Sequence, residues 1–132
     1  MPTPTPTELT LRFMDAFNAR DRAAIRAMLA PDLEYVRPGG GVLRTADAVM
    51  DQYERDFATT ESVRVGVRRS LESGDALMAE ITIHVTVDGR TTAVAAAVAH
   101  GWRDGLLVRY RLYADPLPAA LTAVQPRPES AT

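Results

Sequence analysis

The chain has two parts that differ in hydrophobic periodicity, and the first part has the period of helices. Over residues 7–18 apolar side chains recur every three or four positions, and the same spacing returns after Thr45. This pattern predicts two amphipathic helices, the second of them capped by the Thr45 hydroxyl. Between them we expect a shorter helix that begins after Asp21, a suitable N-cap, continues through Leu29 and ends at Pro31.

From residue 63 onward the period changes from 3.6 to two, because apolar residues now alternate with polar or small ones. Such alternation predicts strands with one buried face. Asp-Gly pairs at 88–89 and 104–105 predict tight hairpin turns. A further short strand precedes the proline and glycines at 38–41. The expected strands span about residues 32–36, 63–67, 77–87, 93–102 and 106–115.

Helices followed by a long antiparallel meander predict an α+β fold, with the helices packed on one face of a strongly curved sheet. At 132 residues, with 46% hydrophobic and 24% charged residues, the chain has the size and composition of one domain. We assign residues 1–118 to that domain, an α+β barrel. Residues 119–132 form a C-terminal tail with too little apolar content to order itself strongly.

Charge and cysteine content exclude several function classes. The net charge is −2, and the 15 basic residues, all arginines, are interspersed with acidic ones. Nucleic acid and membranes are therefore not expected as partners. The absence of cysteine excludes disulfides, thiolate metal sites and cysteine nucleophiles. The sequence shows neither a secretory signal nor an apolar run of roughly 20 residues, so we expect a cytoplasmic protein.

Two stretches carry a family resemblance. "FMDAFNARDRAAIRAMLAPDLEY" resembles the opening of the nuclear-transport-factor-2-like superfamily, and "RDGLLVRYRLYAD" resembles the closing hairpin of its SnoaL-like polyketide cyclase and ketosteroid-isomerase-like branch. The likeness extends over about residues 7–117. It implies a cone-shaped, curved antiparallel or mixed sheet wrapped around three N-terminal helices and enclosing a deep apolar pocket. It also implies a homodimer and a small apolar molecule in the cavity.

Strand parity predicts which side chains face that pocket. If the odd-numbered residues of 77–87 point inward, Ile81, Ile83 and Val85 line the pocket. For the other strands, the alignment of "RDG" with the hairpin of the family that the chain resembles implies the inward residues, unless a one-residue bulge reverses the parity. Glu80 and His84 then point outward. The residues expected to face inward are Tyr35, Arg37, Ile81, Ile83, Val85, Val94, Ala96, Val98, His100, Trp102, Val108, Tyr110, Leu112 and Ala114.

The residues of two known branches are missing. By the resemblance, a ketosteroid isomerase needs a tyrosine, a base carboxylate and a protonated aspartic acid at positions that here hold Phe13, Arg37 and Val98. A limonene-type epoxide hydrolase needs an Arg-x-Asp pair at residues 81–83 and an aspartate at Leu112. Only its water-holding tyrosine has a counterpart, so an epoxide hydrolase-like enzyme stays an alternative.

His100 is the strongest candidate for catalysis, because an imidazole can remove and return a proton near neutral pH. Arg37 would favour its neutral form and pair with an enolate or carboxylate oxygen, and Tyr35 would donate a hydrogen bond to a polarised carbonyl. The two histidines have opposite parity and share a face with no carboxylate cluster, so no metal is expected. The residues expected to bind substrate are Phe13, Phe17, Tyr53, Ile81, Ile83, Val98, Trp102, Tyr110 and Leu112.

Three function classes remain open. We favour a cofactor-free cyclase or isomerase that uses acid–base chemistry on a largely apolar, carbonyl-bearing, polyketide-like substrate. The first alternative is a non-catalytic protein that binds a hydrophobic ligand in the same cavity. The second is a dimeric assembly module whose outer sheet face docks on a partner.

Overall fold

The computed structural model describes residues 2–114, which form three helices and six strands. The end of the expected domain, including Asp115, and the expected tail at 119–132 lie outside the described residues. The elements, in chain order, are α1 (Pro6–Asn18), α2 (Arg22–Ala27), β1 (Leu29–Val36), β2 (Val42–Leu43), α3 (Ala46–Thr59), β3 (Ser62–Ser73), β4 (Ala76–Val87), β5 (Arg90–Arg103) and β6 (Leu106–Ala114).

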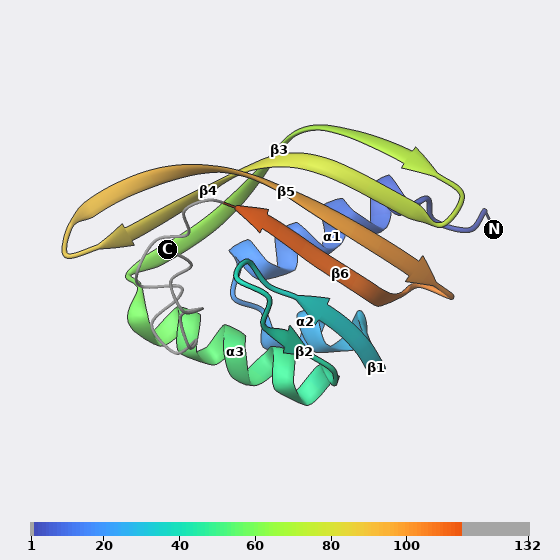
Figure 1. Cartoon of the computed structure of the whole chain (residues 1–132), viewed down its shortest axis with the longest axis horizontal. Coiled ribbons are helices and arrows are strands. Elements are labelled where there is room, and N and C mark those ends of the chain that lie inside the picture. Colours follow the sequence, from blue (N-terminus) through green and yellow to red (C-terminus); the bar gives the residue numbers. More distant parts are fainter. Residues whose placement is uncertain (1, 115–132) are drawn as a thin grey trace.

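The strands form one curved sheet in the order β2-β1-β6-β5-β4-β3, and the helices lie on its concave side (Figure 1). Among the pairings of the described strands, only β1–β6 is parallel, so the sheet is mixed. This is the predicted α+β cone, but the sheet is open between β2 and β3 and is not a closed barrel. No described helix is long and apolar enough to cross a membrane.

The helix starts follow the predicted capping residues. The side chains of Asp21 and Thr45 accept hydrogen bonds from the first turns of α2 and α3. Helix α2 is shorter than expected, because it ends at Ala27 and Leu29 already belongs to β1. The cause is tertiary: the backbone N–H of Leu107 on β6 donates to the carbonyl of Met28, 2.8 Å away, and draws the chain into the sheet.

The hairpins and the inward parity of β4 and β5 are as predicted, with one exception on β6. Asp104 and Gly105 both have positive φ, as the tight turn requires. A bulge between Gly101 and Trp102 pairs Trp102 with Leu107. Leu107 is therefore fully buried, whereas Val108, which was expected to face inward, is only half-buried. Beyond the bulge, Tyr110 and Leu112 keep the predicted inward direction and are buried.

Candidate functional site

Helix α3 places an acidic residue inside the molecule. Tyr53 and Phe57 lie on its buried face, as their spacing predicts, and Asp56 shares that face and is only 5% exposed. Positions three or four apart lie on one side of a helix. Our sequence analysis considered only the apolar members of this stripe and missed Asp56, although its spacing from Val49 and Tyr53 could have revealed it.

The end of β1 supplies the partner of Asp56. Tyr35 and Arg37 are both buried, as the family resemblance implied, and Arg37 is only 3% exposed. After Arg37 the chain turns through Gly39 and Gly40, which both have φ of +91°. The carbonyl of Gly41 accepts a 2.8 Å hydrogen bond from the Arg37 backbone N–H. This turn, which only glycine adopts without strain, holds the Arg37 side chain against the interior.

Arg37 and Asp56 form a buried ion pair with the Arg37 Nη1 and Asp56 Oδ2 atoms 3.7 Å apart. The other Asp56 oxygen accepts a 3.0 Å hydrogen bond from Gln52 Nε2. Arg37 Nη1 also donates to the Tyr35 hydroxyl at 3.3 Å. The carboxylate therefore keeps one oxygen oriented by a neutral amide and turns the other toward the guanidinium.

The pKa values of this pair move in directions that burial and charge explain. Burial raises the pKa of Asp56 above its usual 3.8, and the opposing effects of Arg37 and Gln52 do not cancel the rise. Burial alone would lower the pKa of Arg37, but the nearby Tyr35 and Asp56 oxygens outweigh it and raise that pKa. Asp56 is thus closer to accepting and releasing a proton at moderate pH than an exposed aspartate.

Three tyrosines surround the ion pair. Tyr35 and Tyr110 are direct neighbours on β1 and β6, and their rings stack with centroids 3.9 Å apart. Burial raises the pKa of both, and also that of Tyr53. The Tyr53 hydroxyl oxygen is enclosed and makes no hydrogen bond of full geometry among the described residues, although a looser hydrogen bond with Tyr110 affects the pKa of both groups. A buried hydroxyl that is bonded only loosely is costly, so it marks a place where a ligand oxygen would be favourable.

These groups meet at an internal cavity of about 40 Å³. One enclosed water needs roughly 10–15 Å³, so this cavity has room for only a few water molecules. It is therefore much smaller than the deep pocket we expected, because large side chains fill the rest of the cone. It is nevertheless lined by most of the predicted substrate-binding residues and by Asp56. The lining residues are Phe13, Met14, Phe17, Tyr35, Arg37, Tyr53, Asp56, Val63, Val65, Ile81, Ile83, Tyr110 and Leu112.

His100, Trp102 and Val98 are buried, as predicted, but they do not line this cavity. His100 Nδ1 shares a 3.0 Å hydrogen bond with Thr10 Oγ1, and Trp102 Nε1 donates to the same oxygen at 3.2 Å. The His100 ring packs edge-on against Tyr110, with centroids 4.9 Å apart. The structure therefore brings Tyr35 and Arg37 together at the cavity but places His100 behind Tyr110.

Burial lowers the pKa of His100 from 6.5 to about 3. The cause is desolvation and not the neighbouring charge of Arg37 that we expected. At neutral pH the imidazole is therefore uncharged. Its Nε2 atom has no hydrogen-bond partner within the described part of the chain.

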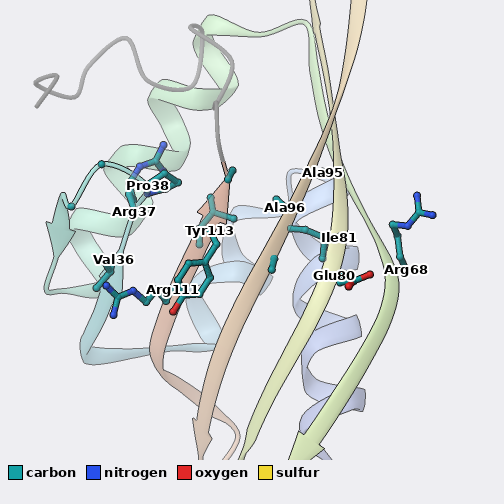
Figure 2. A pocket seen from close by; sticks show the side chains of 15 residues that line it. Val36, Arg37, Pro38, Arg68, Glu80, Ile81, Ala95, Ala96, Arg111 and Tyr113 are labelled. Carbon is teal, nitrogen blue, oxygen red and sulfur yellow. The ribbon is translucent and has the colours of Figure 1, made fainter. Parts of the chain in front are cut away.

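A larger, open groove of about 920 Å³ adjoins the cavity, and the two share Arg37, Ile81 and Leu112 (Figure 2). The turn at Pro38–Gly40 forms one rim, and the middle of β5 contributes three alanines. Figure 2 shows Arg68 and Glu80 on one side of these alanines and Arg111 and Tyr113 on the other. The described residues that line the groove are Val36, Arg37, Pro38, Gly39, Gly40, Arg68, Glu80, Ile81, Ala95, Ala96, Ala97, Arg111, Leu112, Tyr113 and Ala114.

Residues 2–114 contain no group of three or more histidine, cysteine, aspartate or glutamate side chains that could hold a metal ion. The ionisable side chains of the cavity are Arg37, Asp56 and the tyrosines. Such a set can move a proton and stabilise an oxyanion with its own side chains.

Solved structures share this architecture. A putative SnoaL-like polyketide cyclase from Shewanella putrefaciens matches with a TM-score of 0.78 and 13% identity, over 86% of this chain and 92% of that one. TerC, crystallised with polyporic acid, matches with a TM-score of 0.76 and 24% identity, over 83% and 91%. An LEH-like epoxide hydrolase from M. tuberculosis matches with a TM-score of 0.76 and 20% identity, over 83% and 82%. At these identities the likeness establishes the fold alone.

No curated protein matches the sequence. The model of the SnoaL-like domain family, in contrast, matches residues 10–110, which begin within α1 and end on β6. This span includes Arg37, Asp56 and the three cavity tyrosines. On the strength of that match, the chain belongs to the SnoaL-like domain family.

Proposed function

We propose that this chain is a cofactor-free enzyme, a cyclase or isomerase, that acts on a small, largely apolar, carbonyl-bearing molecule. Asp56 is the acid–base group. The observation that supports this role is its place: a carboxylate 5% exposed, with a raised pKa, on the wall of a cavity that is lined, apart from Arg37, by aromatic and aliphatic side chains. General bases are commonly tuned toward the working pH in this way.

The proposed step is an enolisation. Asp56 removes a proton from the carbon next to the substrate carbonyl, the C–H electron pair forms a carbon–carbon double bond, and the carbonyl π electrons move to oxygen. The hydroxyls of Tyr53 and Tyr110, which both line the cavity, donate hydrogen bonds to that oxyanion. Asp56 then returns the proton to another carbon. Alternatively, the enolate carbon attacks a second carbonyl and closes a ring, the π electrons of that carbonyl move to its oxygen, and Asp56 gives its proton to the resulting alkoxide.

The size of the cavity limits what enters it. About 40 Å³ accommodates a carbonyl group and its neighbouring carbons but not a whole bicyclic molecule. The remainder of the substrate lies toward the open groove, which shares Arg37, Ile81 and Leu112 with the cavity. His100 is in this proposal a positioning residue, which holds the Tyr110 ring through their edge-on contact.

The test uses 1-tetralone, a bicyclic aryl ketone, and follows exchange of its α-protons for deuterium by NMR. The native chain is expected to accelerate exchange above the buffer rate, and Asp56→Asn to slow it by at least about 100-fold. The rate should rise with pH as Asp56 loses its proton, with a midpoint above 3.8. Asp51→Asn, an exposed change on the same helix, is the control and should leave the rate unaltered.

Full exchange activity in Asp56→Asn would contradict the role of Asp56. If the native chain accelerates no exchange but binds the ketone, the second candidate applies, a non-catalytic hydrophobic-ligand-binding protein. The observation that favours this alternative is the contact of Asp56 with both Gln52 and Arg37, since each lowers the pKa of the carboxyl and stabilises it as a structural anion.

A further inference from the structure

Helix α3 carries a second buried polar side chain, Gln52, one turn before Asp56. Gln52 is only 3% exposed, and it is not among the described residues that line the cavity, whereas Asp56 is. Positions four apart lie on the same side of a helix, and the Gln52 Nε2 atom donates a 3.0 Å hydrogen bond to Asp56 Oδ1. Gln52 therefore contacts the acid–base group but not the space in which a substrate would lie.

The two oxygens of the Asp56 carboxylate have different neighbours. Oδ1 accepts the hydrogen bond from Gln52, and Oδ2 lies 3.7 Å from Arg37 Nη1, which is longer than a hydrogen bond. A proton on Oδ1 would point at the N–H group of Gln52 and break the bond between them. A proton on Oδ2 leaves that bond intact. Oδ2 is therefore the oxygen that can take up and release a proton without rearrangement of its neighbours.

We propose that Gln52 is the positioning residue of Asp56: it holds Oδ1, so that Oδ2 alone carries the proton exchanged with the substrate. This role rests on the function proposed above. In the enolisation the substrate C–H bond breaks and its proton moves to Oδ2, while Oδ1 keeps its hydrogen bond to Gln52 throughout. A carboxylate held in this way is already oriented for proton transfer and does not have to be ordered during the reaction.

The charged surroundings of Asp56 allow the contribution of Gln52 to be measured separately. The ionisable groups that act on the Asp56 carboxyl are Arg37, Arg55, Tyr35 and Tyr53. Arginine is not deprotonated in proteins, and burial raises the pKa of both tyrosines well above 10. The charged side chains of α2 pair with carboxylates on the exposed side of α3 instead. Among the described residues, β3 contributes only valines to the cavity wall. These charges therefore stay constant while Asp56 titrates.

The experiment makes two measurements on the full chain. The first is the pH dependence of 1-tetralone proton exchange, and the second is the titration of the Asp56 carboxyl carbon by 13C NMR, assigned with Asp56→Asn. Gln52→Leu removes the donor. A hydrogen bond to a carboxylate favours its ionised form, so both midpoints should rise by about one pH unit. The exchange rate at high pH should fall by about tenfold, because the carboxylate can now turn.

Two further variants separate positioning from packing. Gln52→Glu keeps the shape of the side chain but sets a second carboxyl against Asp56, and two adjacent carboxyls do not ionise together easily, so the upper midpoint should rise further than in Gln52→Leu. Thr60→Val is the matched control. The buried Thr60 hydroxyl donates a 2.8 Å hydrogen bond to the backbone carbonyl of Asp56 and not to its carboxylate. Both midpoints in Thr60→Val should equal the native ones.

Several results would overturn the proposal. An unchanged Asp56 midpoint in Gln52→Leu, or an equal shift in Thr60→Val, would show that Gln52 does not act on the carboxylate. A lower rate in Gln52→Leu with native behaviour in Gln52→Glu would reduce Gln52 to packing. If Gln52→Leu fails to fold, the comparison of Gln52→Glu with Thr60→Val decides alone.

Failure of the proposed function has a separate signature. The Asp56 midpoint seen by NMR would then rise in Gln52→Leu, while the exchange rate stayed at the buffer value or kept its native midpoint. That result would refute Asp56 as the base, and with it the positioning role, but would leave the hydrogen bond between Gln52 and Asp56 in place.

Discussion

The Arg37 guanidinium and the Asp56 carboxylate face each other 3.7 Å apart, and the side chains are only 3% and 7% exposed. One belongs to the end of β1 and the other to α3, so the pair joins the sheet to the helix that covers it. Removing one partner of a buried ion pair leaves the other charge without compensation.

Arg37→Met is therefore expected to lower the free energy of unfolding by about 3 kcal/mol. Adding Asp56→Leu should recover at least about half of this loss, since no buried charge then remains. Urea unfolding of the two single variants and the double variant measures the coupling. Additive losses would mean that the two groups do not stabilise each other.

The His100 pKa of about 3 makes the protein sensitive to acid. The folded state keeps His100 neutral, whereas the unfolded chain protonates it near pH 6.5, so the stabilisation is complete above pH 6.5 and is lost as the pH falls toward 3. The full loss is on the order of 5 kcal/mol. In circular dichroism, His100→Gln should unfold at lower pH than the native chain.

His84→Gln is the control for that titration, because His84 is exposed on the outer face of β4. Its acid transition should coincide with that of the native chain. A His84→Gln transition shifted as far as that of His100→Gln would assign the acid sensitivity to histidine charge in general.

Thr10 joins two buried rings through one oxygen. Thr10→Val should cost about 2 kcal/mol, because it leaves His100 Nδ1 and Trp102 Nε1 without their partner. Thr10→Ser keeps the hydroxyl and should cost clearly less. Unfolding followed by the fluorescence of Trp102, the only tryptophan, measures both, and equal losses in the two variants would assign the effect to packing of the Thr10 methyl group.

Tyr53→Phe should leave stability unchanged or raise it by up to about 1 kcal/mol, because the hydroxyl that it removes is buried and makes no hydrogen bond of full geometry among the described residues. Tyr35→Phe should lower stability, since the Tyr35 hydroxyl accepts a hydrogen bond from Arg37. Thermal unfolding compares the two variants. A larger loss in Tyr53→Phe would indicate that its hydroxyl serves the fold and not a ligand.

Much of the fold could be predicted from periodicity, turns and caps, since these are local properties. The inward direction of Tyr35, Arg37 and Tyr110 followed from strand parity together with the family resemblance, which set the register. Val108 shows the limit of that reasoning, because the bulge at Trp102 is created by packing between two strands and leaves no mark in the alternation. The early end of α2 has the same origin, a hydrogen bond from Leu107 on a distant strand.

The site was predicted only in part, because a side chain takes part in its chemistry only if it borders the cavity. His100 and Tyr110 are cross-strand neighbours with the same parity, but Tyr110 lines the cavity and His100 does not. Parity gives the face of a sheet on which a side chain lies, not its distance from an empty space. Asp56 was missed for a different reason, because polar residues on an apolar helix stripe were not treated as candidates.

The placement of β6 between β1 and β5 has a consequence for synthesis of the chain. The last described strand completes the middle of the sheet, so β1 stays without its parallel neighbour until nearly the whole domain has left the ribosome. Contacts so distant in sequence slow folding. We therefore expect nascent chains that stop before residue 106 to depend on chaperones, with the apolar faces of β1 and β5 open to aggregation.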